Sequence, residues 1–187
     1  MIIGFSGRAG AGKDTAANAL ILAFHRQWVR LSFATTLKRA LCVIFGWELA
    51  DWENLAWKET PNDACYGLTP RQVAQSLGTE WGREHVNPNL WVDQALRLAE
   101  DQELYDRHVV FTDVRFPNEV AAIQARAGKV IYLFREGELR TDSSHASEQD
   151  ISHLADVRLT AANGDITGLQ SQVLDVVSDW ITEGELK

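Results

Sequence analysis

A glycine-rich segment near the start of the chain has the composition and spacing of a loop that binds phosphate. Residues 7–13 fit the pattern G-x-x-x-x-G-K and end in Lys13. The glycines let backbone N–H groups curve around phosphate oxygens, and the lysine reaches the β- and γ-phosphates of a nucleotide. We therefore expect ATP to bind here. The residues expected to contact it are Gly7, Gly10, Ala11, Gly12, Lys13, Asp14 and Thr15.

The two residues that follow Lys13 depart from the usual pattern. A Ser or Thr normally comes next and ligates Mg²⁺, whereas this chain has Asp14 and then Thr15. Asp14 has two interpretations, a metal ligand that acts through water or a cap of the following helix. The Thr15 hydroxyl is placed to donate to the α-phosphate.

A second acid, Asp113, follows the apolar run 108–112. In enzymes with a phosphate loop, an acid at the end of a strand holds Mg²⁺ directly or through water. The alternative is a cap for the turn that follows. We expect Mg²⁺ to be bound beside ATP by Asp113 and Asp14. Lys13, Asp113 and Arg115 are expected to be catalytic, with Arg115 placed to touch an acceptor phosphate.

The sequence contains no His-Arg-Asp catalytic loop and no other evident general base. Phosphoryl transfer depends mainly on neutralising charge and aligning the reactants. A phosphate acceptor has a second pKa of about 6, so it is largely dianionic near neutral pH and needs no base. The chemistry therefore favours a phosphate acceptor over an alcohol.

Strands and helices alternate in the segments that would position these residues. Strands are expected at 1–6, 28–33, 108–112, 130–134 and 156–159, and helices at 14–25, 37–45, 70–77, 90–104, 118–127 and 166–181. This alternation predicts an α/β fold, a parallel sheet with helices on both faces. Ligands of such sheets bind at the carboxyl ends of the strands, where Ser6, Asp113 and Arg135 fall.

Length, charge and cysteine content narrow the class of protein. The 187 residues favour one domain with at most a small insertion. A net charge of -8 without a basic stripe argues against nucleic acid as a partner. No apolar run is long enough to predict a membrane span, and the first residues do not read as a signal peptide. Two cysteines predict no disulfide framework and fit a reducing cytoplasm.

The order of the motifs resembles that of phage-type deoxynucleoside monophosphate kinases, within the wider nucleoside monophosphate kinase group. The likeness runs nearly from end to end. Besides the phosphate loop, it rests on Phe33-Ala34-Thr35-Thr36-Leu37-Lys38, Trp57-Lys58-Glu59-Thr60, Thr69-Pro70-Arg71-Gln72, Leu77-Gly78-Thr79-Glu80-Trp81-Gly82-Arg83, Pro88-Asn89-Leu90-Trp91-Val92, Asp113-Val114-Arg115-Phe116-Pro117-Asn118-Glu119, His145-Ala146-Ser147-Glu148 and Asn163-Gly164.

The resemblance implies a three-layer P-loop NTPase fold with a parallel core sheet of about five strands. Residues 1–187 would form a single kinase domain. Its core would comprise residues 1–34 and 107–187, with a helical monophosphate-binding insertion at about 35–106 and a short lid at about 135–150.

The resemblance also implies roles for residues outside the phosphate loop. The acceptor phosphate would be held by Lys38, Arg71, Arg83 and Arg115. The base and sugar pocket would be shaped by Gly78, Thr79, Glu80, Trp81 and Trp91. Arg135 or Arg140 would close on the transferring phosphate, and Asn163 would lie near the adenine.

We therefore expect ATP-dependent phosphorylation of a deoxynucleoside 5′-monophosphate to its diphosphate, in the cytoplasm of a bacterium or a phage-infected host. One alternative is a related kinase that acts on another phosphorylated metabolite, of the phosphomevalonate or dephospho-coenzyme A type. Another is a nucleotide-binding switch, although the Asn-Lys-x-Asp motif of guanine switches is absent. The preferred base, the sugar and the oligomeric state, including a homodimer, stay open.

Overall fold

In the computed structural model, residues 1–24, 27–103, 105–137 and 150–184 are described. The chain divides into two compact units. Unit 1 comprises Met1–Ser32 and Leu98–Lys187, and unit 2 comprises Phe33–Arg97. No helix of the described residues is both long and apolar enough to span a membrane.

Unit 1 is built on a five-stranded sheet, in the order β2-β3-β1-β4-β5, in which every neighbouring pair is parallel. The strands are β1 (Ile2–Ser6), β2 (Trp28–Leu31), β3 (His108–Val114), β4 (Lys129–Arg135) and β5 (Val157–Ala161). All five residues of the central strand β1 are buried, as expected for a parallel strand covered on both faces. The carboxyl ends of all five strands therefore lie along one edge.

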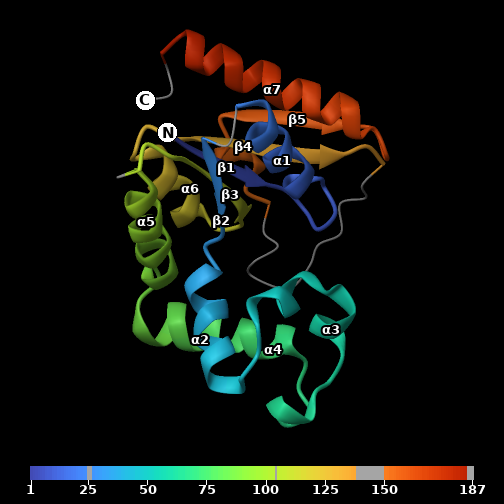
Figure 1. The fold of residues 1–187 in the computed structure, drawn as a ribbon, viewed down its shortest axis with the longest axis vertical. Coiled ribbons are helices and arrows are strands. Elements are labelled where there is room, and N and C mark those ends of the chain that lie inside the picture. The colour runs from blue at the N-terminus through green and yellow to red at the C-terminus, as the bar shows by residue number, and fades with distance from the viewer. Residues whose placement is uncertain (25–26, 104, 138–149, 185–187) are drawn as a thin grey trace. The chain divides into compact units, whose positions relative to one another are not determined.

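Helices cover both faces of this sheet (Figure 1). Helices α1 (Lys13–Ala23) and α7 (Ile166–Thr182) pack on one face. Helix α6 (Pro117–Gln124) packs on the other, against β1 and β4. The buried side of α7 repeats at helical spacing, through Leu169, Val173, Val177 and Trp180. A short 3₁₀ turn, η5 (Ser152–Leu154), precedes β5. The helices and the sheet of unit 1 together form a three-layer arrangement of helix, sheet and helix.

Unit 2 is helical and has a small core of its own, formed by Leu37, Leu41, Trp52 and Trp91. Its elements are α2 (Thr35–Phe45), η1 (Leu49–Glu53), α3 (Leu55–Glu59), η2 (Asp63–Cys65), α4 (Pro70–Gln75), η3 (Ser76–Val86) and α5 (Leu90–Glu103), which passes into unit 1 at Leu98. Trp47, Trp52 and Trp57 meet edge to face, with centroids 5.0–5.9 Å apart.

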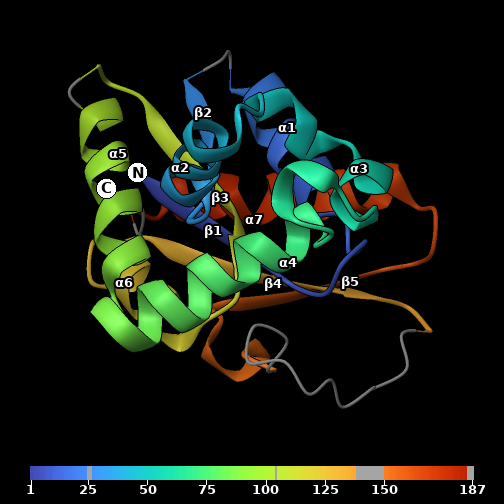
Figure 2. The same ribbon diagram turned by 90° about the horizontal axis from the view of Figure 1, so that it is seen from below.

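The strands and longer helices agree with the sequence predictions to within a few residues, but three segments differ. Strand β3 runs on to Val114, so Asp113 lies inside it. The stretch 46–69, for which no helix or strand was predicted, contains three short helices. Helix α4 continues directly into η3, a π-helix, as one coiled ribbon (Figure 2). Neither residue propensity nor apolar spacing signals the i→i+5 pattern. Most of the expected lid, residues 138–149, lies outside the described residues.

Candidate active site

The segment between β1 and α1 has the backbone conformation of a phosphate-binding loop. Gly7, Gly10 and Gly12 all have positive φ, at 133°, 79° and 92°. At Gly7 a Cβ would also collide with the backbone oxygen of Leu133 on the neighbouring strand β4. Only glycine meets both conditions there, because it has no Cβ and tolerates positive φ. The loop leads into α1, whose first N–H groups and positive dipole end favour a bound anion.

The Lys13 side chain folds back over this loop. Its Nζ donates to the carbonyl oxygens of Gly7 and Arg8, at 2.7 Å each. Lys13 is the first residue of α1, whereas its two acceptors lie at the start of the loop. The ammonium is therefore held at the loop, where it can neutralise charge on a phosphate.

A cavity of about 380 Å³ opens beside the loop, entirely within unit 1. Eight of the nine residues expected to contact ATP line it: Gly10, Ala11, Gly12, Lys13, Asp14, Thr15, Arg135 and Asn163. The exception is Gly7. The remaining wall is mostly apolar or backbone, and comprises Phe134, Ala161, Ala162, Gly164, Asp165, Ile166 and Leu169. An apolar wall with a few polar groups suits a nucleotide.

The turn between β5 and α7 forms one side of the cavity, and of its residues only Asn163 was assigned a role from the sequence. Gly164 has a φ of 86°, and the Asp165 carboxylate accepts from the N–H of Gly168 at 2.9 Å. A glycine followed by a helix-capping acid is the signal by which Asp165 could have been added to this turn.

Arg135 places a second cation beside the loop. It is an exposed residue at the carboxyl end of β4. Its Nη1 lies 3.6 Å from the position that a Cβ would take at Gly10. Arg135 thus extends over the middle of the loop, and the Lys13 ammonium lies at its start.

Asp14, one of the two expected metal ligands, is largely exposed and lies beside Arg30. The carboxylate Oδ1 of Asp14 is 3.3 Å from Nη1 of Arg30, and the Asp14 side chain is 77% exposed. Arg30 also donates to Asn18 Oδ1 on the next turn of α1. An exposed ion pair of this kind contributes about 0–1 kcal/mol to stability, so Arg30 orients Asp14 more than it strengthens the fold.

Asp113, the other expected metal ligand, meets the end of the neighbouring strand. Its Oδ2 accepts from the Ser32 hydroxyl at 2.5 Å. Ser32 directly follows β2, which pairs with β3, so the register brings the two side chains together. Ser32 was not assigned a role from the sequence, although a polar residue at the end of a second parallel strand is a signal for this edge. Both groups offer the hard oxygen donors that Mg²⁺ prefers.

No group of three His, Cys, Asp or Glu side chains forms a ready-made metal cage among the described residues. Mg²⁺ does not require one, because it commonly takes one or two carboxylates together with substrate phosphates and water. The residues present therefore fit a magnesium ion that binds together with a nucleotide.

Arg115 is exposed, and a buried carboxylate fixes its backbone. Glu119, 1% exposed, accepts from the N–H groups of Arg115 at 2.7 Å and of Phe116 at 3.1 Å. This closes the first turn of α6 and sets the direction in which Arg115 leaves β3. Glu119 was not assigned a role from the sequence. Its position three residues after Phe116, the N-cap of α6, is a capping signal.

In unit 2, the π-helix η3 carries Gly78, Thr79, Glu80, Trp81 and Arg83, five of the residues expected to bind the acceptor. Ser76 at its start donates to Glu80 Oε2 at 2.7 Å. Trp81 is 50% exposed, whereas Gly78 is buried. The π-helix therefore presents an aromatic face together with polar side chains.

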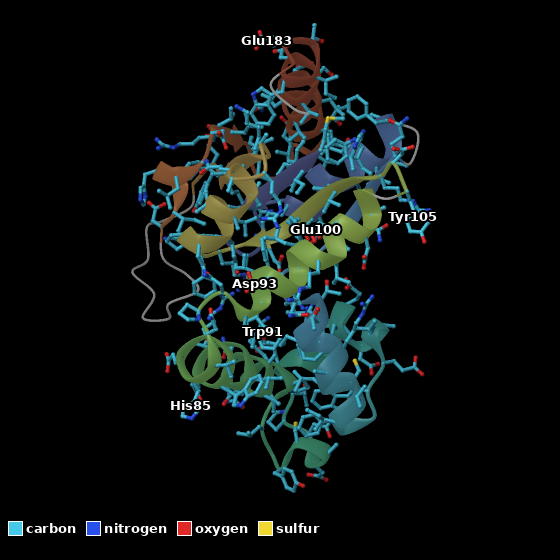
Figure 3. The ribbon with its side chains drawn as sticks, turned by 90° about the vertical axis from the view of Figure 1, so that its left-hand side faces the viewer. His85, Trp91, Asp93, Glu100, Tyr105 and Glu183 are labelled. Atoms are coloured by element: carbon cyan, nitrogen blue, oxygen red, sulfur yellow. The ribbon has the colours of Figure 1, made fainter. Side chains whose placement is uncertain are left out.

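Trp91 supports the π-helix from the first turn of α5 (Figure 3). It is buried, and its Nε1 donates to the Gly78 carbonyl at 2.8 Å. A Cβ at Gly82 would lie 2.5 Å from the same Nε1, so the indole packs directly on the backbone of the helix. Trp91 thus shapes this region through the backbone of Gly78 and Gly82.

Lys38 and Arg71 lie in the same unit. Lys38 Nζ is 5.9 Å from the centroid of the Trp52 ring. Arg71 forms an ion pair with Glu59 on α3, at 2.5 Å. The neighbouring Lys58 was given no role from the sequence. Partial burial, followed by the positive charges of Lys38 and Arg71, lowers the pKa of Lys58 below its ordinary value.

Two expected features, Arg140 and the segment His145-Ala146-Ser147-Glu148, fall outside the described residues.

Comparison with known proteins identifies the family. The family model of deoxynucleotide monophosphate kinases matches residues 50–173. A protein of Acanthamoeba polyphaga mimivirus that carries this name is 31% identical over 194 residues, which cover 96% of this chain and 97% of that protein. This chain belongs to the deoxynucleotide monophosphate kinase family. The family expected from the sequence is therefore confirmed.

Two further likenesses agree with membership of the deoxynucleotide monophosphate kinase family. The deoxynucleoside-5′-monophosphate kinase of Escherichia phage T5 is 38% identical over 66 residues, or 33% of this chain and 24% of that protein. The crystal structure of shikimate kinase from Aquifex aeolicus superposes with a TM-score of 0.50 at 9% identity, covering 95% of this chain and 96% of that one. The likeness to shikimate kinase concerns the fold alone. It supports the predicted three-layer α/β fold with a parallel sheet.

Proposed function

We propose that this protein transfers the γ-phosphate of ATP to a deoxynucleoside monophosphate, with Mg²⁺ as its metal cofactor, and releases ADP and the deoxynucleoside diphosphate. One observation carries the proposal: in a chain of this family, the phosphate loop borders a cavity lined by eight of the nine residues expected to contact ATP.

ATP would bind in unit 1. The loop amides and the start of α1 would hold the phosphates, and Lys13 and Arg135 would neutralise charge on the group being transferred. The hydroxyl of Thr15 is assigned to the α-phosphate. The turn that carries Asn163, with its apolar neighbours, would take the adenine.

Mg²⁺ would be held by Asp113, with Asp14 acting through water, and Ser32 would orient the Asp113 carboxylate. When bound, the metal neutralises charge on the β- and γ-phosphates of ATP. The two carboxylates are the only residues we assign to it. Charge neutralisation and alignment leave no step that requires a general base.

The acceptor would bind through charges and an aromatic face. Lys38, Arg71 and Arg83 in unit 2 are assigned to its phosphate, and Arg115, set by Glu119, is a further phosphate-binding arginine. Trp81 would stack on the base, since every base offers a π-face to an aromatic ring.

The remaining acceptor residues are assigned to the sugar and the edge of the base: Gly78, Thr79 and Glu80, with Trp91 fixing the helix that carries them. We retain residues 35–106 as the monophosphate-binding insertion and 135–150 as a lid in which Arg140 closes on the transferring phosphate. These assignments are proposals.

The test is a coupled assay of ADP formation from ATP with each of the four common deoxynucleoside monophosphates, their ribose counterparts, phosphomevalonate and dephospho-coenzyme A. We expect strong stimulation by at least one deoxynucleoside monophosphate and loss of activity when a chelator removes Mg²⁺. ATP consumption that no acceptor stimulates would favour a nucleotide-binding switch instead. Stimulation by one of the other metabolites alone would favour the related kinases.

A further inference from the structure

Unit 2 contains a group of three cations whose arrangement the mechanism above does not fully use. We name the side chains of Lys38, Lys58 and Arg71 the cation cluster. They come from three elements, α2, α3 and α4, which are seen together in Figure 2. Helix α4 packs against both α2 and α3. The fold of unit 2 therefore collects cations that lie 33 residues apart along the chain.

Contacts around α3 connect the cluster. Lys38 Nζ lies over the ring of Trp52, and Trp52 meets Trp57 edge to face with centroids 5.4 Å apart. Trp57 directly precedes Lys58. On the other side, Arg71 Nε pairs with Glu59, the residue after Lys58. The residues on both sides of Lys58 are therefore linked to the other two cations, and the charges of Lys38 and Arg71 both act on Lys58.

The two lysines of the cluster are short of acceptors. Among the described residues, neither the Lys38 nor the Lys58 ammonium donates a hydrogen bond or forms an ion pair within 4.0 Å. Lys58 is half-buried, and its burial and the other two cations together lower its pKa, outweighing the opposing effect of Glu53 and Glu59. Such a group favours a bound anion, because an anion would relieve the repulsion between the cations.

The sole carboxylate in direct contact with the cluster, among the described residues, is Glu59 on Arg71. Both partners are partly exposed, at 38% for Arg71 and 50% for Glu59. A carboxylate that pairs with an arginine at the surface can be displaced by a phosphate, since both anions bind the guanidinium in the same way.

We infer that Lys58 is a phosphate-binding residue for the acceptor, alongside Lys38 and Arg71, and that Glu59 occupies Arg71 until the acceptor phosphate displaces it. This inference rests on the proposed function and adds two residues to it. Lys58 supplies a third positive charge for a dianionic phosphate. Glu59 lowers the affinity for that phosphate, and so disfavours ligands with too little charge to displace it.

The inference predicts opposite effects for two adjacent substitutions. Lys58→Met keeps the aliphatic stem and removes the charge. It should raise the KM for the deoxynucleoside monophosphate about tenfold, while the Kd for ATP stays within twofold of the wild-type value. Glu59→Gln frees Arg71 and should lower the same KM about two- to fivefold.

A matched control lies in unit 1. Arg126 and Glu100 form an ion pair at 2.9 Å whose side chains are 39% and 56% exposed, close to the values for Arg71 and Glu59. Glu100 lies on α5, far along the helix from Trp91 (Figure 3). Glu100→Gln removes the carboxylate partner of Arg126, as Glu59→Gln removes that of Arg71, but it should leave the KM for the monophosphate unchanged. Arg126→Gln removes a cation from unit 1 and is the control for Lys58→Met.

Thermal unfolding distinguishes binding from a structural role. Removing a charge repelled by two neighbours should leave the melting temperature of Lys58→Met equal to or above that of the wild type. A lower melting temperature together with an unchanged KM would make Lys58 structural and overturn the inference. The inference would also be overturned if the KM of Glu59→Gln equalled that of Glu100→Gln or exceeded that of the wild type. Either result would mean that Glu59 does not compete with the phosphate.

The kinetics use whichever of the four deoxynucleoside monophosphates the wild-type enzyme turns over fastest. Normal wild-type turnover with no shift of KM in either variant would overturn this inference and leave the proposed function intact. Absence of wild-type turnover with all four would overturn the proposed function, and the inference with it.

Discussion

The phosphate loop of unit 1 and the cation cluster of unit 2 offer different parts of the polypeptide to an anion. The loop would use backbone N–H groups within residues 7–13, together with the start of one helix. The cluster uses the ends of three long side chains from three elements, and its charges repel one another. Backbone groups are held by the covalent chain and by glycine conformations, whereas side-chain ends are held only by packing.

This difference has a physical consequence for specificity. Backbone donors bind any polyphosphate whose shape follows the loop, so they suit a donor shared by many kinases. Separate cations can change one at a time, so they suit selection of the acceptor. Repulsion among them opposes folding in the absence of substrate. The five predictions below test this contrast, starting with the largest effect.

Lys13→Ala should lower kcat about 10²–10³-fold, because the ammonium that the loop holds would no longer neutralise charge on the transferring phosphate. Its Nζ donates to two backbone carbonyls of the loop, and the sheet and the core helices should stay intact. Steady-state kinetics and circular dichroism measure the two effects. A near-normal rate would remove Lys13 from the proposed mechanism.

Arg83→Lys should affect the acceptor side alone. A charge-assisted Arg–phosphate bond contributes about 1.5–3 kcal/mol, so its loss corresponds to about 10- to 150-fold in kcat/KM for the monophosphate. Lysine should not restore it, because lysine lacks the planar fork. Isothermal titration with a non-hydrolysable ATP analogue should give an unchanged Kd. Equal losses for both substrates would instead make Arg83 structural.

Trp91→Phe tests whether the π-helix must be held in place. The substitution leaves the Gly78 carbonyl without its indole donor and should cost about 1–3 kcal/mol of stability. The KM for the monophosphate should rise several-fold while the Kd for ATP is unchanged. Trp180→Phe, at a buried tryptophan of unit 1, is the matched control for lost volume. If both variants shift the KM alike, the effect comes from general destabilisation.

Asp14→Asn should lower kcat less than about fivefold. The carboxylate is exposed and paired with Arg30, a pair that contributes about 0–1 kcal/mol, and its proposed contact with Mg²⁺ is through water. The Mg²⁺ dependence of the rate, titrated in parallel for Asp113→Asn, separates the two acids. A loss above a hundredfold for Asp14→Asn would mean that this carboxylate ligates the metal directly.

The smallest effect concerns pH. Burial and the positive charges of Lys38 and Arg71 lower the pKa of Lys58 in the folded state. The carboxylates of Glu53 and Glu59 oppose this shift but only partly offset it. Between the folded pKa and the ordinary value of 10.5, the unfolded chain holds more protons, so this lysine's contribution to stability improves as pH rises through that window. At neutral pH the lysine is charged, and its unfavourable contribution to the stability of the fold is therefore fully present.

The measurement compares the melting temperatures of Lys58→Met and the wild type. The variant should melt slightly higher at neutral pH, and the difference should shrink as pH approaches 10.5. A difference that is constant with pH would show that charge repulsion at Lys58 does not contribute to stability.

The sequence by itself determined the parts of the protein that depend on neighbours along the chain. The phosphate loop is contiguous, and its glycines are required by local backbone conformation, as at Gly7. The apolar runs that become β1, β3 and β4 are buried on both faces, so composition alone identified them. The motif order also predicted the family that the comparisons confirm.

Only the tertiary structure decided the pairings between distant residues. Ser32 meets Asp113 because parallel strands of one sheet place their ends side by side, and these residues are 81 positions apart. Trp91 holds Gly78 across 13 positions, inside a π-helix that no apolar period signals. Lys58 acquires its repelling neighbours Lys38 and Arg71 when α2, α3 and α4 pack together. These contacts depend on register and packing in three dimensions, which residue type and spacing along the chain do not specify.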